Sequence, residues 1–363
     1  MRKATPLPAA LMAGAVGLGT LSGCSSTAPA SSEGELRVVA TTTQVGDFVR
    51  EIVGEVDGVS VYQLLQPGVS PHAFDPSAAD LVALTEADIV IENGVDFEPW
   101  LDDALASAAS DPVVVDSSDG VALLAYSEEE GHEHSDDEHS DDEHSDDEHS
   151  DDEHDHDHDH DHDHGEHDPH IWQSAADAEI MVDNIAAALI EADPDNANTY
   201  SANADTYLGT LEELDAWIIA SVDQVPAEDR LLVTSHDALG YYVDRYDLEY
   251  VGAVIPSLDD SAEASALEID ELVALIQETG APAVFAESSV NPAAAETIAA
   301  EAGVTVFSGD DALYADSFGV AGTPGATYVG SMVHNTELIV GSWGVEPAPV
   351  PDAVADAANV DAD

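Results

Sequence analysis

The sequence predicts an α/β protein of two lobes, each built on a mainly parallel sheet. Three observations lead to this prediction. Short apolar segments alternate with amphipathic helical segments after residue 36, a pattern typical of parallel strands joined by helices. The same alternation resumes after residue 230. Between the two regions lies a helical pattern of about 28 residues, and a helix of that length spans about 42 Å, which is long enough to cross both lobes.

The first lobe is predicted over residues 36–193. Four short apolar runs indicate strands at 36–40, 59–65, 88–92 and 113–115. Helices are expected between them at 45–53, 77–86 and 100–108, because their apolar residues recur at helical spacing. A further helix is expected around Ile180 to Ile190, after an insertion at 128–168 that interrupts the lobe.

The linking helix and the second lobe follow in order. Pro194 is expected to begin the linking helix, in the first-turn position that proline favours, and the helix is expected to run over 194–222. The second lobe is predicted over 230–345, with strands at 231–234, 250–255, 283–286 and 304–307 and helices at 269–278, 292–302 and 327–340. Residues 346–363 are rich in Pro, Ala and Asp, and we expect them to form a loose tail.

Residues 1–24 have the features of a signal peptide rather than of folded structure. Basic residues precede an apolar stretch from Leu7 to Leu21, which is too short and too rich in Gly and Ala for a membrane span. The stretch ends in LSGC, which closely matches the bacterial lipoprotein box, so Cys24 is the expected lipidation site. A plain secretory signal is the alternative. Residues 25–35 are expected to be a tether, and a single cysteine excludes a disulfide within the chain.

The charge balance is strongly acidic, with 77 acidic residues against 6 basic ones and a formal net charge of -71. The insertion holds only 23 of the acidic residues, so the rest of the chain is acidic too. Such a surface argues against nucleic acid and anionic membrane as partners. It also suggests a halophilic protein, because salt screens the repulsion between like charges. Unfolding at low salt is the expected consequence.

The insertion between residues 128 and 168 contains 12 of the 16 histidines, embedded in Asp and Glu. It has no apolar side chain that could build a core, so we expect it to be disordered. Imidazole and carboxylate groups bind zinc and similar transition metals. The histidines are therefore candidate ligands of auxiliary weak metal sites: His132, His134, His139, His144, His149, His154, His156, His158, His160, His162, His164 and His167.

Four histidines lie outside this insertion or directly after it: His72, His170, His236 and His334. His72 and His236 each follow a predicted strand, at the end where α/β sheets place ligands. One histidine in such a place is more often a hydrogen-bonded structural residue. Two of them, with His170 where the metal-binding insertion ends, are better explained as converging metal ligands. We interpret His334 as a surface residue of the last long helix.

The chain resembles the zinc-specific solute-binding proteins of metal ABC transporters, a cluster that also holds manganese-binding members, over roughly residues 36–342. PGVSPHAFDP at 67–76 matches the first-ligand loop of that family, DPHIW at 168–172 the second-ligand motif and TSHDALGY at 234–241 the third. The family's fourth ligand is an aspartate in a short Asp-Ser context, which corresponds to Asp316 in YADSF. An acidic tract before the second histidine is also typical of the zinc members.

The resemblance implies a long rigid helix between the lobes and a zinc ion in the cleft, bound by His72, His170, His236 and Asp316. The chemistry agrees, because three neutral imidazoles and one carboxylate satisfy tetrahedral zinc. Manganese prefers more oxygen ligands, and manganese members have a carboxylate at the third position, so His236 discriminates between the metals. Four protein ligands leave no open position for an activated water, which argues for transport rather than catalysis.

The expected function is that of an extracytoplasmic zinc receptor, monomeric and lipid-anchored on the outer face of the membrane, which delivers zinc to an ABC permease. Three alternatives remain: a manganese receptor, a zinc-dependent hydrolase with Asp316 as base, and a surface adhesin. No nucleophile motif, phosphate loop or HExxH helix supports an enzyme. Asp75 and Asp237 are candidates to orient the imidazoles. Glu287 follows a strand as His236 does, and we leave it outside the ligand set.

Overall fold

The computed structural model describes residues 35–72, 74–126, 167–262 and 264–358. The predicted signal peptide, lipidation site and nearly all of the tether lie outside the described residues, as does the insertion up to residue 166. The described chain from Leu36 onward belongs to one compact unit. None of the helices in the described ranges is long and apolar enough to cross a membrane.

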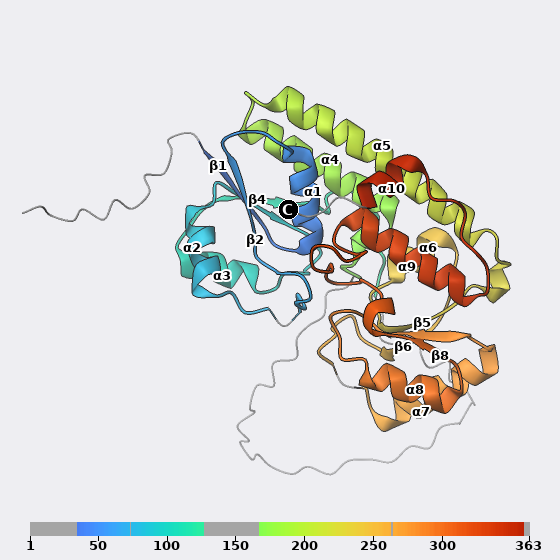
Figure 1. The fold of residues 1–363 in the computed structure, drawn as a ribbon. Helices are drawn as coiled ribbons and strands as arrows, with labels where there is room; N and C mark the ends of the chain where they lie inside the picture. Colours follow the sequence, from blue (N-terminus) through green and yellow to red (C-terminus); the bar gives the residue numbers. More distant parts are fainter. Residues whose placement is uncertain (1–34, 73, 127–166, 263, 359–363) are drawn as a thin grey trace, which may run out of the picture. The chain divides into compact units, whose positions relative to one another are not determined.

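The first lobe is a four-stranded parallel sheet in the order β2-β1-β3-β4 (Figure 1). Its strands are β1 (Leu36–Ala40), β2 (Val59–Gln63), β3 (Ile89–Glu92) and β4 (Val113–Asp116), connected by α1 (Thr43–Val53), α2 (Ala78–Glu86) and α3 (Leu101–Ala108). The central strands are buried on both faces, as the continuous apolar runs require. The Thr42 and Ser77 side chains cap α1 and α2 by accepting backbone hydrogen bonds, which fixes where these helices begin. The predicted alternation of strand and helix is confirmed here.

Two long helices, α4 (Ala175–Ala192) and α5 (Ala197–Val222), pack against each other and connect the lobes (Figure 1). Near its start α5 meets the first lobe, where Asn203 donates to the Ile52 carbonyl. Near its end Asp215 pairs with Arg245 of α6 (Gly240–Tyr246). The linking helix therefore contacts both lobes as expected. Its predicted start was wrong, because Pro194 lies in the turn between α4 and α5 rather than in the first turn of α5.

The second lobe has two parallel strand pairs, β5-β6 and β7-β8, with β5 and β7 side by side. Its elements are β5 (Leu231–His236), α6 (Gly240–Tyr246), β6 (Glu249–Ile255), α7 (Ala266–Thr279), β7 (Ala283–Phe285), α8 (Ala293–Ala302) and β8 (Thr305–Phe307). A core of its own holds α7 and α8 against the strands through Val233, Ile276, Val284 and Ile298. The last long helix, α9 (Tyr328–Ser342), then packs against α5 and α1.

The prediction of a loose tail was wrong as far as residue 358. A short helix, α10 (Asp352–Ala358), packs on α9 and α5, and the Val354 side chain is fully buried. The segment before α10 is held as well, because the Trp217 indole donates to the Ala348 carbonyl and the Ala348 amide donates to Ser221. Hydrogen bonds between side chains of α5 and the backbone and one buried valine anchor this segment. A composition rich in Pro and Ala predicts neither kind of contact.

Candidate metal centre

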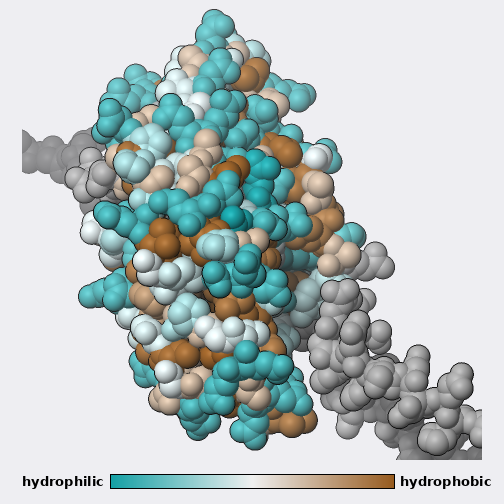
Figure 2. All heavy atoms as spheres, turned by 90° about the vertical axis from the view of Figure 1, so that its right-hand side faces the viewer, coloured by the Kyte–Doolittle hydropathy of each residue, from teal (hydrophilic) through white to brown (hydrophobic). Residues whose placement is uncertain are grey.

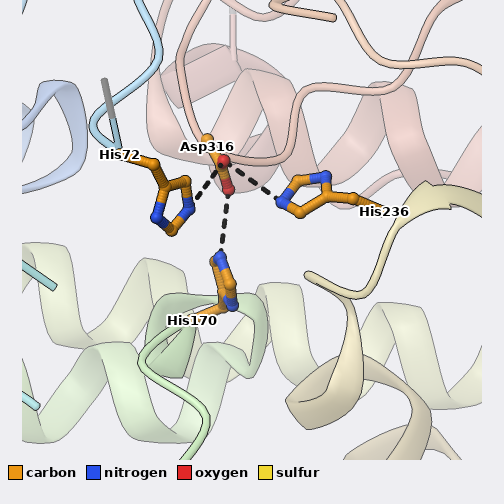
Figure 3. Close-up of side chains that lie close together, drawn as sticks. All are labelled: His72, His170, His236 and Asp316. Carbon is orange, nitrogen blue, oxygen red and sulfur yellow. Dashed lines mark ion pairs between the residues drawn. The ribbon is translucent and has the colours of Figure 1, made fainter. Parts of the chain in front are cut away.

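Four side chains from distant parts of the chain converge between the lobes: His72, His170, His236 and Asp316 (Figure 3). His72 lies in the loop after β2, and His170 directly precedes a short 3-10 helix at Ile171–Gln173. His236 is the last residue of β5. Asp316 lies in the segment between β8 and α9. The structure therefore brings together all four residues that the sequence singled out, and one ligand atom from each lies within 4.8 Å of the others.

The distances from the Asp316 carboxylate to the three imidazoles match the spacing of two ligand atoms on one zinc ion. Asp316 lies 3.3 Å from His72 Nε2, 3.3 Å from His170 Nε2 and 3.2 Å from His236 Nε2, measured from its carboxylate oxygens. Ligand atoms that surround one zinc ion at about 2 Å in a tetrahedron lie roughly 3.3 Å from one another. The carboxylate thus lies close enough to each imidazole to share a metal ion with it, and the three Nε2 atoms are turned toward it (Figure 3).

The ligand atoms are buried and lack hydrogen-bond partners among the described residues. These atoms are Nε2 of the three histidines and both carboxylate oxygens of Asp316. The side chains of His170, His236 and Asp316 are 0% exposed, whereas that of His72 is 12% exposed. A buried polar atom without a partner costs about 1–3 kcal/mol, so the cluster is unfavourable unless the imidazoles are protonated toward Asp316 or a cation is bound. A divalent cation would satisfy all of them together.

Two carboxylates hold the rings of the buried histidines from behind. Asp168 Oδ1 lies 2.7 Å from His170 Nδ1, and Glu287 Oε1 lies 2.8 Å from His236 Nδ1. Each carboxylate also accepts the backbone N–H of the same histidine. With Nδ1 protonated and bound to the carboxylate, Nε2 presents its lone pair to the centre.

The residues that the sequence suggested for this orienting role do not perform it. Asp75 is exposed, and Asp237 accepts a hydrogen bond from Tyr250 rather than from an imidazole. Asp168 belongs to the quoted DPHIW motif, two residues before His170, so its proximity to the ring was available in the sequence. Glu287 lies behind His236, outside the cluster of four, in the place of an orienting acid.

The imidazoles and the carboxylates of the site shift one another's pKa. Burial lowers the pKa of His170, but Asp168 and Asp316 outweigh it and raise the pKa to about 9. Burial acts likewise on His236, and Glu287 with Asp316 raises its pKa well above the ordinary value. Burial raises the pKa of Asp316, but the two facing imidazoles bring it well below its usual range. In the metal-free site, protons on the imidazoles therefore occupy the place that a cation would take.

The segment that carries Asp316 is anchored to residues of the first lobe and of the linking region. The Ala315 carbonyl accepts hydrogen bonds from the Gln44 amide and from the Trp172 indole. Gln44 donates to the Asp316 carbonyl too, at 3.0 Å. Because these donors lie in α1 and next to His170, the fourth side chain of the cluster is fixed relative to α1 and to the segment that carries His170.

The insertion leaves and re-enters the fold beside the cluster. Ala125 and His167 form an antiparallel bridge, and the Asp168 amide donates to the Leu124 carbonyl at 3.0 Å. The Tyr241 hydroxyl joins the two ends by donating to the Asp168 carbonyl and accepting from the Leu124 amide. The other eleven candidate histidines of the insertion lie outside the described residues, but its second end is two residues from His170.

His334 is not part of the cluster, as expected, and it is a partly covered rather than a fully exposed residue. The side chain is partly buried, its Nε2 lies 3.0 Å from the Ala312 carbonyl, and its ring packs on Tyr314. The local sequence is polar, but the helix faces the segment at 312–314, which covers the ring.

Comparison with known proteins places these features in a wider group. A family model described as the zinc-uptake complex component A, periplasmic, matches residues 38–342. The manganese-binding lipoprotein MntA of Halalkalibacterium halodurans is 30% identical over 85% of this chain and 89% of its own. The zinc-binding protein TroA of Treponema pallidum is 28% identical over 86% of this chain and 90% of its own. A solved structure of TroA superimposes with a TM-score of 0.70 at 26% identity, covering 85% of this chain and 99% of that one.

Proposed function

Because the chain belongs to the family of the periplasmic zinc-uptake complex component A, we propose that it is the extracytoplasmic receptor that delivers zinc to the permease of an ABC transporter. The family and its structural neighbours are metal-binding transport proteins, not enzymes. The hydrolase reading with Asp316 as base therefore has no support. A divalent metal is the cargo, and the four-residue cluster is the site that we assign to it.

Zinc is the proposed cargo on the strength of the donor set. Three imidazole nitrogens and one carboxylate that converge on one point suit zinc, whereas manganese favours a larger share of oxygen ligands. The relatives carry both names, MntA for manganese and TroA for zinc, so they support metal binding without choosing the metal. Manganese is the second candidate for that reason. His236 is the residue on which the choice depends.

Binding and release follow from proton exchange at the imidazoles. Zinc needs neutral Nε2 atoms, so its arrival displaces protons that Asp316 otherwise holds on His170 and His236. Asp168 and Glu287 keep the opposite nitrogens protonated and the rings in place. Since the pKa of His170 is about 9, zinc affinity should fall as the pH is lowered from about 9, as protons compete for the ring.

The histidine-rich insertion is the proposed collector of zinc. Its histidines would form several weak sites that raise the local zinc concentration next to the cleft. The bonded ends of the insertion support this role, because its second end is held in place two residues before His170. The receptor is further proposed to act as a monomer on a lipid anchor at Cys24. A second role in adhesion stays an alternative that no feature of the described residues favours.

The proposal is tested by competitive titration of the purified protein with zinc and manganese, using a chelator of known affinity. We expect one tight zinc site and a clear preference for zinc over manganese. His236→Ala removes one ligand and leaves Glu287 buried without its partner, so zinc affinity should fall by orders of magnitude. His334→Ala is the matched control, because it removes a histidine outside the cluster. An unchanged dissociation constant in the first variant would eliminate the proposed site.

A further inference from the structure

The three histidines of the proposed site are not held alike. His170 and His236 are fully buried, with Nδ1 fixed by Asp168 and Glu287. His72 is the one ligand side chain with measurable exposure, at 12%, and among the described residues no carboxylate or carbonyl binds its Nδ1. Its ring instead packs edge-on against Phe97, with centroids 5.3 Å apart. Solvent therefore reaches the site on the side of His72, past the ligand that is least constrained.

On that side, loops of the two lobes are joined by hydrogen bonds. The Ser70 hydroxyl, two residues before His72, donates to Asp260 Oδ1 at 2.7 Å. Asp260 lies in the loop between β6 and α7 of the second lobe, 190 positions further along the chain. Nearby, the Gly68 amide donates to the Ser317 hydroxyl at 2.8 Å, next to Asp316. The first-ligand loop is thus hydrogen-bonded both to the loop of Asp260 and to the segment of Ser317.

The charged residues of the cluster influence the pKa of the Asp260 carboxyl. Burial raises the pKa of its carboxyl and the Ser70 hydrogen bond lowers it. The charge of Asp316 raises it further, while His236 and His72 lower it. The Ser70 hydrogen bond places Asp260 next to the loop that carries His72, yet Asp260 is not one of the four converging side chains. It is partly exposed, so it also reaches solvent.

We propose that Asp260 is a transfer residue, the oxygen ligand that zinc meets first on arrival and leaves last on release, with His72 as the next ligand in line. This inference rests on the proposed function. Parting of the Ser70 hydrogen bond frees the carboxylate, which then holds the cation together with the exposed imidazole. The ion next moves inward to the fixed imidazoles and Asp316, and the hydrogen bond forms again.

Two substitutions separate this role from that of a simple strut between lobes. Asp260→Asn keeps an oxygen that accepts the Ser70 hydrogen bond, but it removes the charge and the metal ligand. Ser70→Ala keeps the carboxylate and removes the hydrogen bond. If Asp260 transfers zinc, Asp260→Asn binds and releases zinc more slowly than the native chain. If Asp260 only joins the two lobes through its hydrogen bond, the rates change in Ser70→Ala and not in Asp260→Asn. Asp259→Asn is the control, since it removes the same charge from the neighbouring position.

The experiment measures zinc association and chelator-driven zinc release by stopped flow on the full chain and on each variant. We expect Asp260→Asn to slow both association and release by about tenfold, which corresponds to about 1.4 kcal/mol in each barrier, with a nearly unchanged dissociation constant. Ser70→Ala should leave both rates at least as fast. At about 1 M salt, where the Debye length is about 3 Å, the effect should persist, because it depends on direct contact.

Rates for Asp260→Asn equal to those for Asp259→Asn would overturn the inference. So would a large loss of equilibrium affinity with an unchanged association rate, because Asp260 would then be a ligand of the final site. Failure of the proposed function is a different result, in which the native chain has no tight zinc site and no rates exist to compare.

Discussion

At the scale of single residues, the site is organised by pairs of a histidine and a carboxylate. The pair of His236 and Glu287 joins the ends of two adjacent strands of the second lobe, and the pair of His170 and Asp168 lies within one motif. Each carboxylate holds a buried ring and keeps its proton on the nitrogen that faces away from the centre. The ligands are therefore positioned before any cation arrives, which limits the ordering that binding requires.

Glu287→Gln tests this arrangement. The amide fits the same space but no longer stabilises a protonated Nδ1, so zinc affinity should fall by about 10- to 100-fold, as is common for residues behind metal-binding histidines. Competitive titration measures the change, and Glu301→Gln on the exposed face of α8 is the control. Equal zinc affinity in the two variants would contradict an orienting role for Glu287.

The four converging residues could be named from the sequence, whereas of their two carboxylate partners only Asp168, in the DPHIW motif, left a signal there. The histidines were recognisable because they follow strands or belong to quoted motifs, and Asp316 because of the family resemblance. Glu287 was set aside as structural, since its contact with His236 spans 51 positions and depends on how β5 and β7 lie together. Asp75 and Asp237 were favoured by closeness in sequence, which does not determine where a loop side chain points.

At the scale of elements, the strands and most helices could be predicted because apolar periodicity reports burial directly. The deviations have local causes. Pro194 fits a first helical turn, but the chain needs a turn between α4 and α5, and the proline serves it. The short helix α6 follows the His236 motif and was not among the expected helices. The helix α10 depends on contacts with α5 and α9 that a short segment rich in Ala does not reveal by its own sequence.

The insertion is an element whose removal can be tested cleanly. Its ends are already joined by the bridge between Ala125 and His167, so replacing residues 131–165 by a short Gly-Ser linker should leave the fold intact. We expect the tight zinc site to persist and the total number of zinc ions bound per chain to fall. Metal analysis and titration of the two proteins measure this. Loss of the tight site would mean that the insertion supplies its ligands.

At the scale of the whole molecule, excess negative charge dominates. Arg230 and Arg245 are paired with aspartates, and lysine occurs only at Lys3. The face in Figure 2 is covered mostly by hydrophilic side chains, with apolar ones scattered between them. Few of the 77 acidic residues can therefore find a cationic partner within the chain.

We propose that the fold relies on salt to screen this charge. The midpoint of thermal unfolding should rise steadily as sodium chloride is raised from dilute buffer to about 1 M, where the Debye length falls to about 3 Å. Circular dichroism at each salt concentration, on the protein kept free of metal by a chelator, separates screening from metal binding. A midpoint that does not depend on salt would contradict the proposal.

The central claim is that one zinc ion is bound between the lobes by three histidines and an aspartate. Anomalous diffraction from zinc-loaded crystals, recorded on both sides of the zinc absorption edge, tests it most directly. We expect one dominant peak about 2.0–2.2 Å from the Nε2 atoms of His72, His170 and His236 and from a carboxylate oxygen of Asp316. A dominant peak elsewhere, or a water molecule in the place of Asp316, would contradict the claim.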